Sequence, residues 1–251
     1  MKKVMLVVVT LFLMSSSFTA CKKEVKQTDQ PQGQSGIVTG KVTDSRGNAI
    51  AGAKVVIEHA VLYASYVYAT TDNNGNYKVA VPTEPAGSWT AKAQVEKNAY
   101  GKDYTFDLLP ENTDPITKEH GAVRNFTWKL TGQRAGTNRF YGAHVDLYQF
   151  GTDVPMDKVK LVFTPFGGEN TLIDGSPAVP LERNVEDVAG TFMAKDVPVG
   201  KYTVKAVYEG KKLLLDNRHD EGEPEEEKTV IFGKNGHLAE TEYNIEFWLS
   251  E

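Results

Sequence analysis

Two strand-like segments separated by glycines constrain the fold of this chain more than any other feature. Lys41–Asp44 and Lys54–Ile57 alternate polar and apolar residues, and Gly47 and Gly52 lie between them. A third glycine, Gly75, lies in a similar turn further along the chain. Alternation with a period of two is typical of β-strands, and glycine adopts tight-turn conformations at low cost. The stretch therefore predicts strands joined by tight turns, and it contains no obvious reactive group.

Seven segments of residues 36–131 have this strand character, and no helical periodicity competes with them. They are residues 37–43, 53–58, 62–70, 76–81, 88–95, 104–109 and 122–130. In the last segment Arg124, Phe126, Trp128 and Leu130 share one face, and apart from the arginine this is the pattern of a strand buried on one side. Short strands with frequent glycine, proline and asparagine turns predict a β-sandwich.

Residues 142–251 repeat this character less clearly. The predicted strands are residues 143–150, 158–164, 191–194, 202–208, 228–232 and 242–249. Gly87 and Gly200 each stand two residues before an aromatic residue that opens an alternating run, which indicates the same sandwich strand used twice. We therefore predict an all-β fold with two tandem β-sandwich domains, at residues 36–131 and 142–251.

An export signal precedes the first predicted domain. Lys2 and Lys3 stand before an apolar run at residues 4–14, and small residues follow, so residues 1–20 are predicted to be a signal peptide. The run is shorter than the roughly 20 residues that a membrane-spanning helix needs. Residues 21–35 are mostly polar and are predicted to be a flexible tether.

The glycine-rich stretch resembles the carboxypeptidase regulatory-like domain family. The similarity lies in Gly40-x-Val42-x-Asp44-x-x-Gly47-x-x-Ile50-x-Gly52-Ala53-x-Val55-x-Ile57 and in Thr71-Asp72-x-x-Gly75-x-Tyr77. The resemblance implies a transthyretin-like, or prealbumin-like, seven-stranded sandwich of a kind frequent in exported proteins of Bacteroidetes. Such domains often serve as accessory modules, so an accessory role in a zinc-dependent hydrolase system is one alternative. The motif consists of turn and core positions and specifies no activity.

Phe18-Thr19-Ala20-Cys21 resembles the lipobox of bacterial lipoproteins, although leucine is usual where Phe18 stands. The resemblance implies that Cys21 is lipidated and becomes the mature N-terminus, anchored in a membrane. Lys22 then implies sorting to the outer membrane. Whether the protein faces the periplasm or the cell surface is left open by the sequence. The alternative is an ordinary signal peptide followed by an unmodified cysteine. Because Cys21 is the single cysteine, the chain has no internal disulfide.

The charge of the chain argues against nucleic acid as a partner. Removing Lys2 and Lys3 from the 28 basic residues leaves 26 against 33 acidic residues, a formal charge of −7. Phosphate binding relies on a concentrated basic patch, which this composition does not favour.

Catalytic and metal motifs are weak, so we expect no enzyme activity, no cofactor and no metal site. His237 and Glu240 have the H-x-x-E spacing of zinc peptidases, but only eleven residues follow Glu240, too few for a distant third ligand. Residues 72–76 are predicted to form a hairpin turn rather than a calcium loop. The acidic run at residues 216–227 is predicted to be a solvated loop, with cation binding as the alternative. A crosslink from Lys158 or Lys160 to Asn244, as in surface-protein B-type repeats, is a further alternative.

Aromatic residues are the remaining candidates for ligand contact. Trp89 and Trp128 alternate as core residues should, whereas Tyr66, Tyr100 and Tyr141 are the candidates for exposed ligand contacts. We therefore expect a noncatalytic lipoprotein of the cell envelope that acts as a binding or assembly module. Its partner is then an unidentified envelope protein or a glycan, with carbohydrate binding as the specific alternative.

Overall fold

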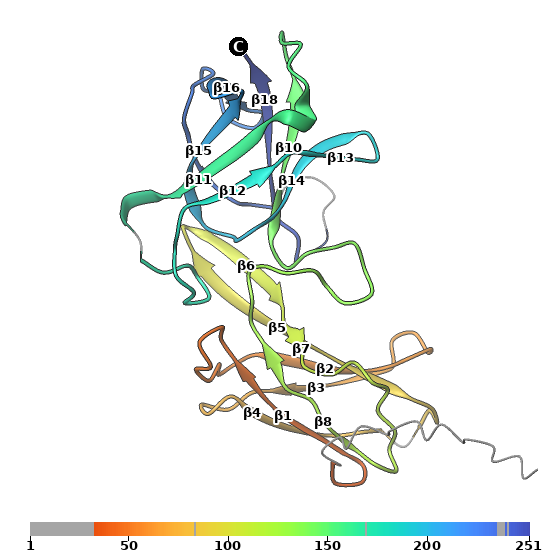
Figure 1. Cartoon of the computed structure of the whole chain (residues 1–251). Coiled ribbons are helices and arrows are strands. Elements are labelled where there is room, and N and C mark those ends of the chain that lie inside the picture. Colours follow the sequence, from red (N-terminus) through yellow and green to blue (C-terminus); the bar gives the residue numbers. More distant parts are fainter. Residues whose placement is uncertain (1–32, 83, 169, 235–238, 240) are drawn as a thin grey trace, which may run out of the picture. The chain divides into compact units, whose positions relative to one another are not determined.

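The computed structural model describes residues 33–251 except 83, 169, 235–238 and 240. The predicted signal peptide, Cys21 and most of the tether lie outside the described residues. The described part consists of strands, loops and two 3-10 turns, η1 (Met156–Lys158) and η2 (Phe166–Gly168) (Figure 1). None of its helices is long and apolar enough to span a bilayer. The predicted all-β fold with two sandwiches is confirmed.

The first sandwich has a five-stranded and a four-stranded sheet. The five-stranded sheet has the order β4 (Asn76–Ala80), β1 (Ile37–Thr43), β9 (Phe126–Thr127), β7 (Leu109–Pro110), and β8 (Ala122–Val123) also pairs with β1. The four-stranded sheet has the order β3 (Tyr66–Thr70), β2 (Lys54–His59), β5 (Trp89–Ala99), β6 (Lys102–Asp107). Trp89 and Trp128 are buried, as predicted.

Two predicted strands of the first sandwich differ from the structure. Residues 122–130 are not one strand, because β8 and β9 are separated at Arg124. Arg124 is buried, and its guanidinium donates hydrogen bonds to the carbonyl oxygens of Val123 and Asp114. The predicted strand at residues 62–70 begins only at Tyr66, because the residues after His59 form a loop.

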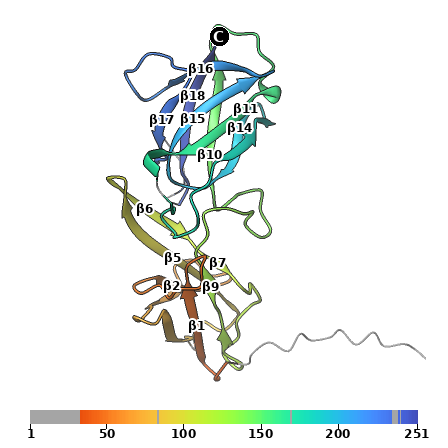
Figure 2. The ribbon, with the colours of Figure 1, turned by 60° about the vertical axis from the view of Figure 1, so that its left-hand side comes forward.

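The second sandwich has two layers that share one strand (Figure 2). One layer contains β11 (Lys160–Pro165), β12 (Leu181–Asn184), β15 (Lys201–Tyr208) and β17 (Lys228–Ile231). The other contains β10 (Ala143–Gln149), β13 (Glu186–Val188), β14 (Thr191–Val197) and β18 (Asn244–Ser250). The shared strand β16 (Lys211–Asn217) pairs first with β15 and then with β18, which joins all nine strands into one sheet. Leu147, Phe163 and Phe247 are fully buried between the layers.

The glycine-rich stretch forms turns and close contacts, as predicted. Gly47 and Gly75 have φ values of +85° and +75°, which favour glycine. The turn at Asp72 is closed by its own carboxylate, since Oδ1 accepts hydrogen bonds from the backbone N–H groups of Asn74 at 2.9 Å and Asn76 at 2.8 Å. The stretch is therefore scaffold, and the candidate site lies on another surface.

Candidate functional site

The outer face of the four-stranded sheet carries the candidate site. Strand alternation directs Val67 and Ala69 of β3 toward the core and Tyr66 and Tyr68 toward solvent. Tyr66 is 47% exposed and Tyr68 is 57% exposed. Their ring centroids lie 5.1 Å apart at an interplanar angle of 59°. Two large aromatic surfaces are therefore presented side by side.

The pairing register brings charged and amide side chains onto the same face. Glu58 of β2 lies opposite Tyr66 of β3. On β5, Lys92 shares a row with Tyr68 through the β2 residue between them, and Gln94 lies opposite Asp107 of β6. The strands thus assemble a surface from segments far apart in the sequence.

A groove of about 630 Å³ follows this face and continues toward the segment that joins the sandwiches. We call it the tyrosine groove, after the side chains that line it. The lining includes Glu58, Tyr66, Tyr68, Lys92, Gln94, Asp107, Arg134, Tyr141 and Thr241.

Every charged side chain named for the groove has a partner of opposite charge. Lys92 Nζ lies 2.6 Å from Glu58 Oε2, and Arg134 forms an ion pair with Asp107. The Arg134 guanidinium carbon also lies 5.0 Å from the ring centroid of Tyr141. The groove therefore offers many hydrogen-bonding groups without a surplus of either charge.

Asp107 is the most constrained of these groups. Gln94 Nε2 donates to Asp107 Oδ1 at 2.9 Å, and Thr241 Oγ1 donates to Oδ2 at 2.7 Å. Burial raises the pKa of Asp107, but the hydrogen bonds from Gln94, Thr241 and Arg134 outweigh burial and hold the pKa below its usual value. The carboxylate is therefore ionised at neutral pH and serves as a fixed acceptor.

The structure brings together two of the three tyrosines predicted to contact a ligand. Tyr66 and Tyr141 both line the tyrosine groove. Tyr100 does not, because it lies half-buried in the turn between β5 and β6 with a φ of 52°. Tyr68 also lines the groove but was not among the ligand contacts predicted from the sequence, although its position two residues after Tyr66 on a predicted strand was a usable signal. Cys21 lies outside the described residues.

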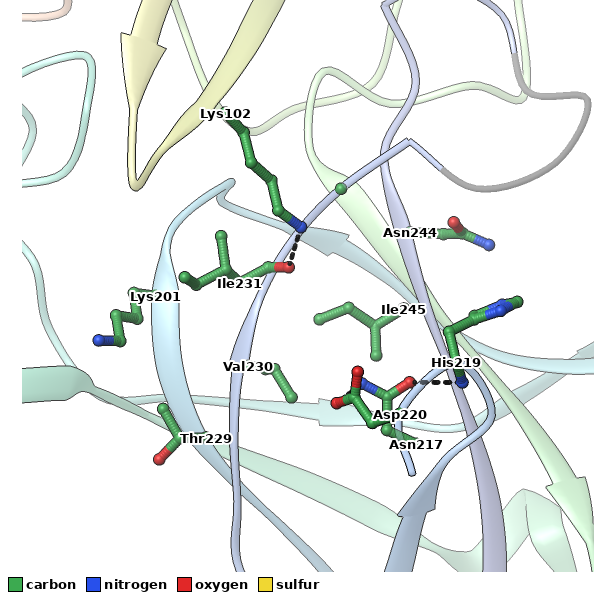
Figure 3. Close-up of a pocket in the computed structure, with 11 residues that line it drawn as sticks. Lys102, Lys201, Asn217, His219, Asp220, Thr229, Val230, Ile231, Asn244 and Ile245 are labelled. Carbon is green, nitrogen blue, oxygen red and sulfur yellow. Dashed lines mark hydrogen bonds between the residues drawn. The ribbon is translucent and has the colours of Figure 1, made fainter. Parts of the chain in front are cut away.

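A second pocket, of about 290 Å³, is lined by Lys102, Lys201, His219 and Asp220 among others (Figure 3). Its polar groups are largely engaged. Lys102 Nζ donates to the carbonyl oxygen of Ile231 at 3.4 Å, and Asn217 Nδ2 donates to Asp220 Oδ2 at 2.6 Å. This pocket therefore makes a weaker candidate than the tyrosine groove.

The acidic run at residues 216–227 begins on β16 and continues as an exposed segment. Lysines accompany its glutamates: Glu227 Oε1 lies 2.8 Å from Lys205 Nζ, and Glu226 Oε2 lies 2.9 Å from Lys212 Nζ. Hydrogen bonds from Lys205 and Lys212 lower the pKa of Glu227. Within the described residues, no three histidine, cysteine or acidic side chains are grouped to hold a metal ion.

The two remaining alternatives from the sequence are the crosslink to Asn244 and the H-x-x-E segment. Asn244 Nδ2 donates to Asp146 Oδ2 at 2.9 Å, whereas Lys160 Nζ lies 2.8 Å from Glu182 Oε2 on the neighbouring strand. The structure thus gives Lys160 and Asn244 separate partners. The H-x-x-E segment, with His237 and Glu240, lies outside the described residues.

No protein-family model matches the chain, and no curated protein matches it. Among solved structures, a Pseudomonas aeruginosa protein for which carbohydrate binding has been suggested matches with 16% identity and a TM-score of 0.26, over 40% of this chain and 92% of that one. A streptococcal ancillary pilin matches with 13% identity and a TM-score of 0.27, over 83% and 62%. The TIE protein of Bacillus anthracis matches with 16% identity and a TM-score of 0.29, over 85% and 33%, so the chain spans a third of that protein. These scores are too low to assign a family or a ligand.

Proposed function

We propose that this protein is a noncatalytic binding module whose ligand is a saccharide held in the tyrosine groove. The supporting observation is the pair of exposed rings, Tyr66 and Tyr68, beside a set of fixed donors and acceptors. The C–H faces of a sugar ring pack on aromatic side chains, and its hydroxyl groups hydrogen-bond to polar groups at defined positions. The tyrosine groove combines both kinds of contact.

The charge balance of the groove favours a neutral saccharide. Lys92 is paired with Glu58 and Arg134 with Asp107, so an anionic ligand meets a carboxylate beside each cation. Hydroxyl groups can both donate to carboxylates and accept from the ammonium and guanidinium groups. Binding is then expected to depend only weakly on salt concentration.

The experiment is a glycan array followed by calorimetric titration of the best neutral oligosaccharide. Tyr66→Ala combined with Tyr68→Ala removes both rings and is expected to weaken binding at least tenfold, equivalent to about 1.4 kcal/mol. Tyr63→Ala is the matched control, because Tyr63 is 100% exposed and does not line the groove. Equal affinity of the double variant and the wild type, or a blank array, would count against the proposal.

We also propose that the protein is exported and anchored to the cell envelope through lipid on Cys21. The support is the signal-like N-terminal segment and the lipobox-like placement of Cys21. Acyl chains stabilise membrane attachment by about 0.8 kcal/mol per buried CH₂ group. Labelling with a fatty-acid analogue tests the idea: wild-type protein is expected to incorporate the label in the membrane fraction, and Cys21→Ser to lose both label and membrane association. A labelled Cys21→Ser variant would contradict it.

A further inference from the structure

We propose that the protein forms a twofold dimer in which β3 of one copy pairs antiparallel with β3 of a second copy. Three features of β3 support this dimer. β3 lies at the edge of its sheet, its outer backbone N–H and C=O groups point away from the sheet, and it carries no charged side chain. The dimer joins two four-stranded sheets edge to edge.

β3 is an edge strand. It ends the order β3-β2-β5-β6, and within the described residues β3 pairs with no strand other than β2. The N–H of His59 donates to the carbonyl oxygen of Ser65 at 2.8 Å, and the N–H of Thr71 to that of Ala53 at 3.0 Å. Antiparallel strands bond at every second residue, so the N–H and C=O groups of Tyr66, Tyr68 and Thr70 point away from β2.

The segment around β3 lacks the features that protect edge strands from pairing. Edge strands of soluble proteins commonly carry charges or proline, or are very short. Residues 60–71 contain no charged residue, no proline and no glycine. The other edges within the described residues do carry such features: Lys78 in β4, Asp103 in β6, Pro110 in β7, Glu182 in β12, Asp187 in β13 and Lys228 in β17. An unprotected edge beside two exposed tyrosines is expected to be covered by another strand.

The absence of charge favours a second copy as that strand. In an antiparallel pair of identical strands, each charged residue comes near its own equivalent, and like charges directly opposite destabilise a sheet. β3 avoids this cost. With the twofold axis at Tyr68, the outward-facing groups of Tyr68 meet those of Tyr68 in the second copy, and Tyr66 meets Thr70.

This register keeps the tyrosine groove accessible. The rings of Tyr66 and Tyr68 lie on the outer face of the sheet, whereas the new hydrogen bonds form along its edge. The four rings of two copies then adjoin, as cross-strand aromatic pairs that stabilise sheets. Within the described residues each chain offers one such edge, so the assembly closes at two copies.

The oligomeric state of the full chain is the test, measured by analytical ultracentrifugation from about 1 to 100 μM. Wild type is expected to dimerise. Thr70→Pro removes an N–H that points toward the second copy and is expected to be monomeric, with an unchanged circular dichroism spectrum. Thr70→Ala keeps that N–H and is the matched control, expected to remain dimeric. A monomeric wild type, or a Thr70→Pro variant that dimerises as well as wild type, would overturn the proposal.

A crosslinking experiment covers the case in which Thr70→Pro fails to fold. Opposed residues of a hydrogen-bonded antiparallel pair have Cα atoms about 5.5 Å apart, within disulfide range. Tyr68→Cys, in a chain that also carries Cys21→Ser, is therefore expected to give a covalent dimer on mild oxidation. Lys92→Cys, on the same face but in the central strand β5, is expected to stay uncrosslinked. Failure of Tyr68→Cys to crosslink contradicts the register, and a crosslinked Lys92→Cys contradicts the edge contact.

Discussion

The hydroxyl group of Tyr77 donates a 2.7 Å hydrogen bond to the backbone carbonyl oxygen of Arg124. Tyr77 lies on β4 and Arg124 between β8 and β9, with β1 between the two segments in the sheet. The tyrosine side chain therefore crosses β1, and it does so over Gly40, which pairs with Tyr77. A Cβ atom on Gly40 would lie 1.8 Å from the Arg124 carbonyl oxygen and 2.8 Å from Tyr77 Cε1. Gly40 and Tyr77 of the sequence motif thus form one packing unit.

Substitution of Gly40 by alanine is expected to destabilise the protein by more than about 3 kcal/mol, or to prevent folding, because the added methyl group overlaps backbone atoms. The measurement is urea unfolding followed by tryptophan fluorescence. Gly47→Ala is the matched control, since among the described residues nothing beyond its two chain neighbours lies within 4 Å of its added Cβ. It carries only the cost of a positive φ, about 1 kcal/mol. Similar losses for the two variants would show that the contact at Gly40 is not limiting.

Tyr77→Phe is expected to lower the free energy of unfolding by about 1–2 kcal/mol. The change keeps the buried ring and removes the hydrogen bond to Arg124, which leaves a carbonyl oxygen less well satisfied. Burial raises the pKa of Tyr77, so the hydroxyl stays protonated and able to donate across the neutral range. Tyr63→Phe is the control, because Tyr63 is fully exposed. A loss below about 0.3 kcal/mol for Tyr77→Phe would indicate that water replaces the hydroxyl.

His59 holds the loop between β2 and β3. Its Nδ1 atom accepts hydrogen bonds from the N–H groups of Val61 at 3.2 Å and Leu62 at 3.0 Å, and the ring packs edge-on against Trp89 at 5.0 Å. Because His59 is also buried, His59→Ala is expected to cost about 2 kcal/mol.

The distinguishing measurement for His59→Ala is hydrogen exchange. The amides of Val61 and Leu62 are expected to exchange much faster than in the wild type, because they lose their acceptor. His120→Ala, at an exposed position, is expected to change neither stability nor these two rates. Unchanged protection of both amides in His59→Ala would refute the role assigned to the ring.

Protonation of Asp107 at low pH is expected to lower the free energy of unfolding. Its pKa in the folded protein lies below the value of about 3.9 in an unfolded chain, so the unfolded chain binds more protons as the pH falls. The contribution of Asp107 is thus complete above about pH 5 and is lost as the pH falls through the folded pKa. Asp107→Asn is expected to cost about 1 kcal/mol at pH 7 and to flatten the pH dependence of unfolding below pH 5. Asp103→Asn, at an exposed position, serves as the control. An unaltered acid profile for Asp107→Asn would rule out this assignment.

The alternation of polar and apolar residues was sufficient to predict strands that are buried on one face and exposed on the other. β1 coincides with the predicted segment, and the alternation of Phe126, Trp128 and Leu130 marks the buried face correctly. It failed for β16, where Leu213, Leu214 and Leu215 follow one another without alternation. It also failed for β12 and β13, because their charged side chains suit both an edge strand and a loop.

The class of fold, the turns and much of the core follow from the sequence, because periodicity and glycine placement act over a few residues. The candidate site depends on long-range strand pairing. Tyr66, Lys92 and Asp107 come from three strands, and their juxtaposition depends on which strands pair and in what register. A shift of one residue in any pairing would turn these side chains toward the core, so the groove exists only once the long-range pairing is made.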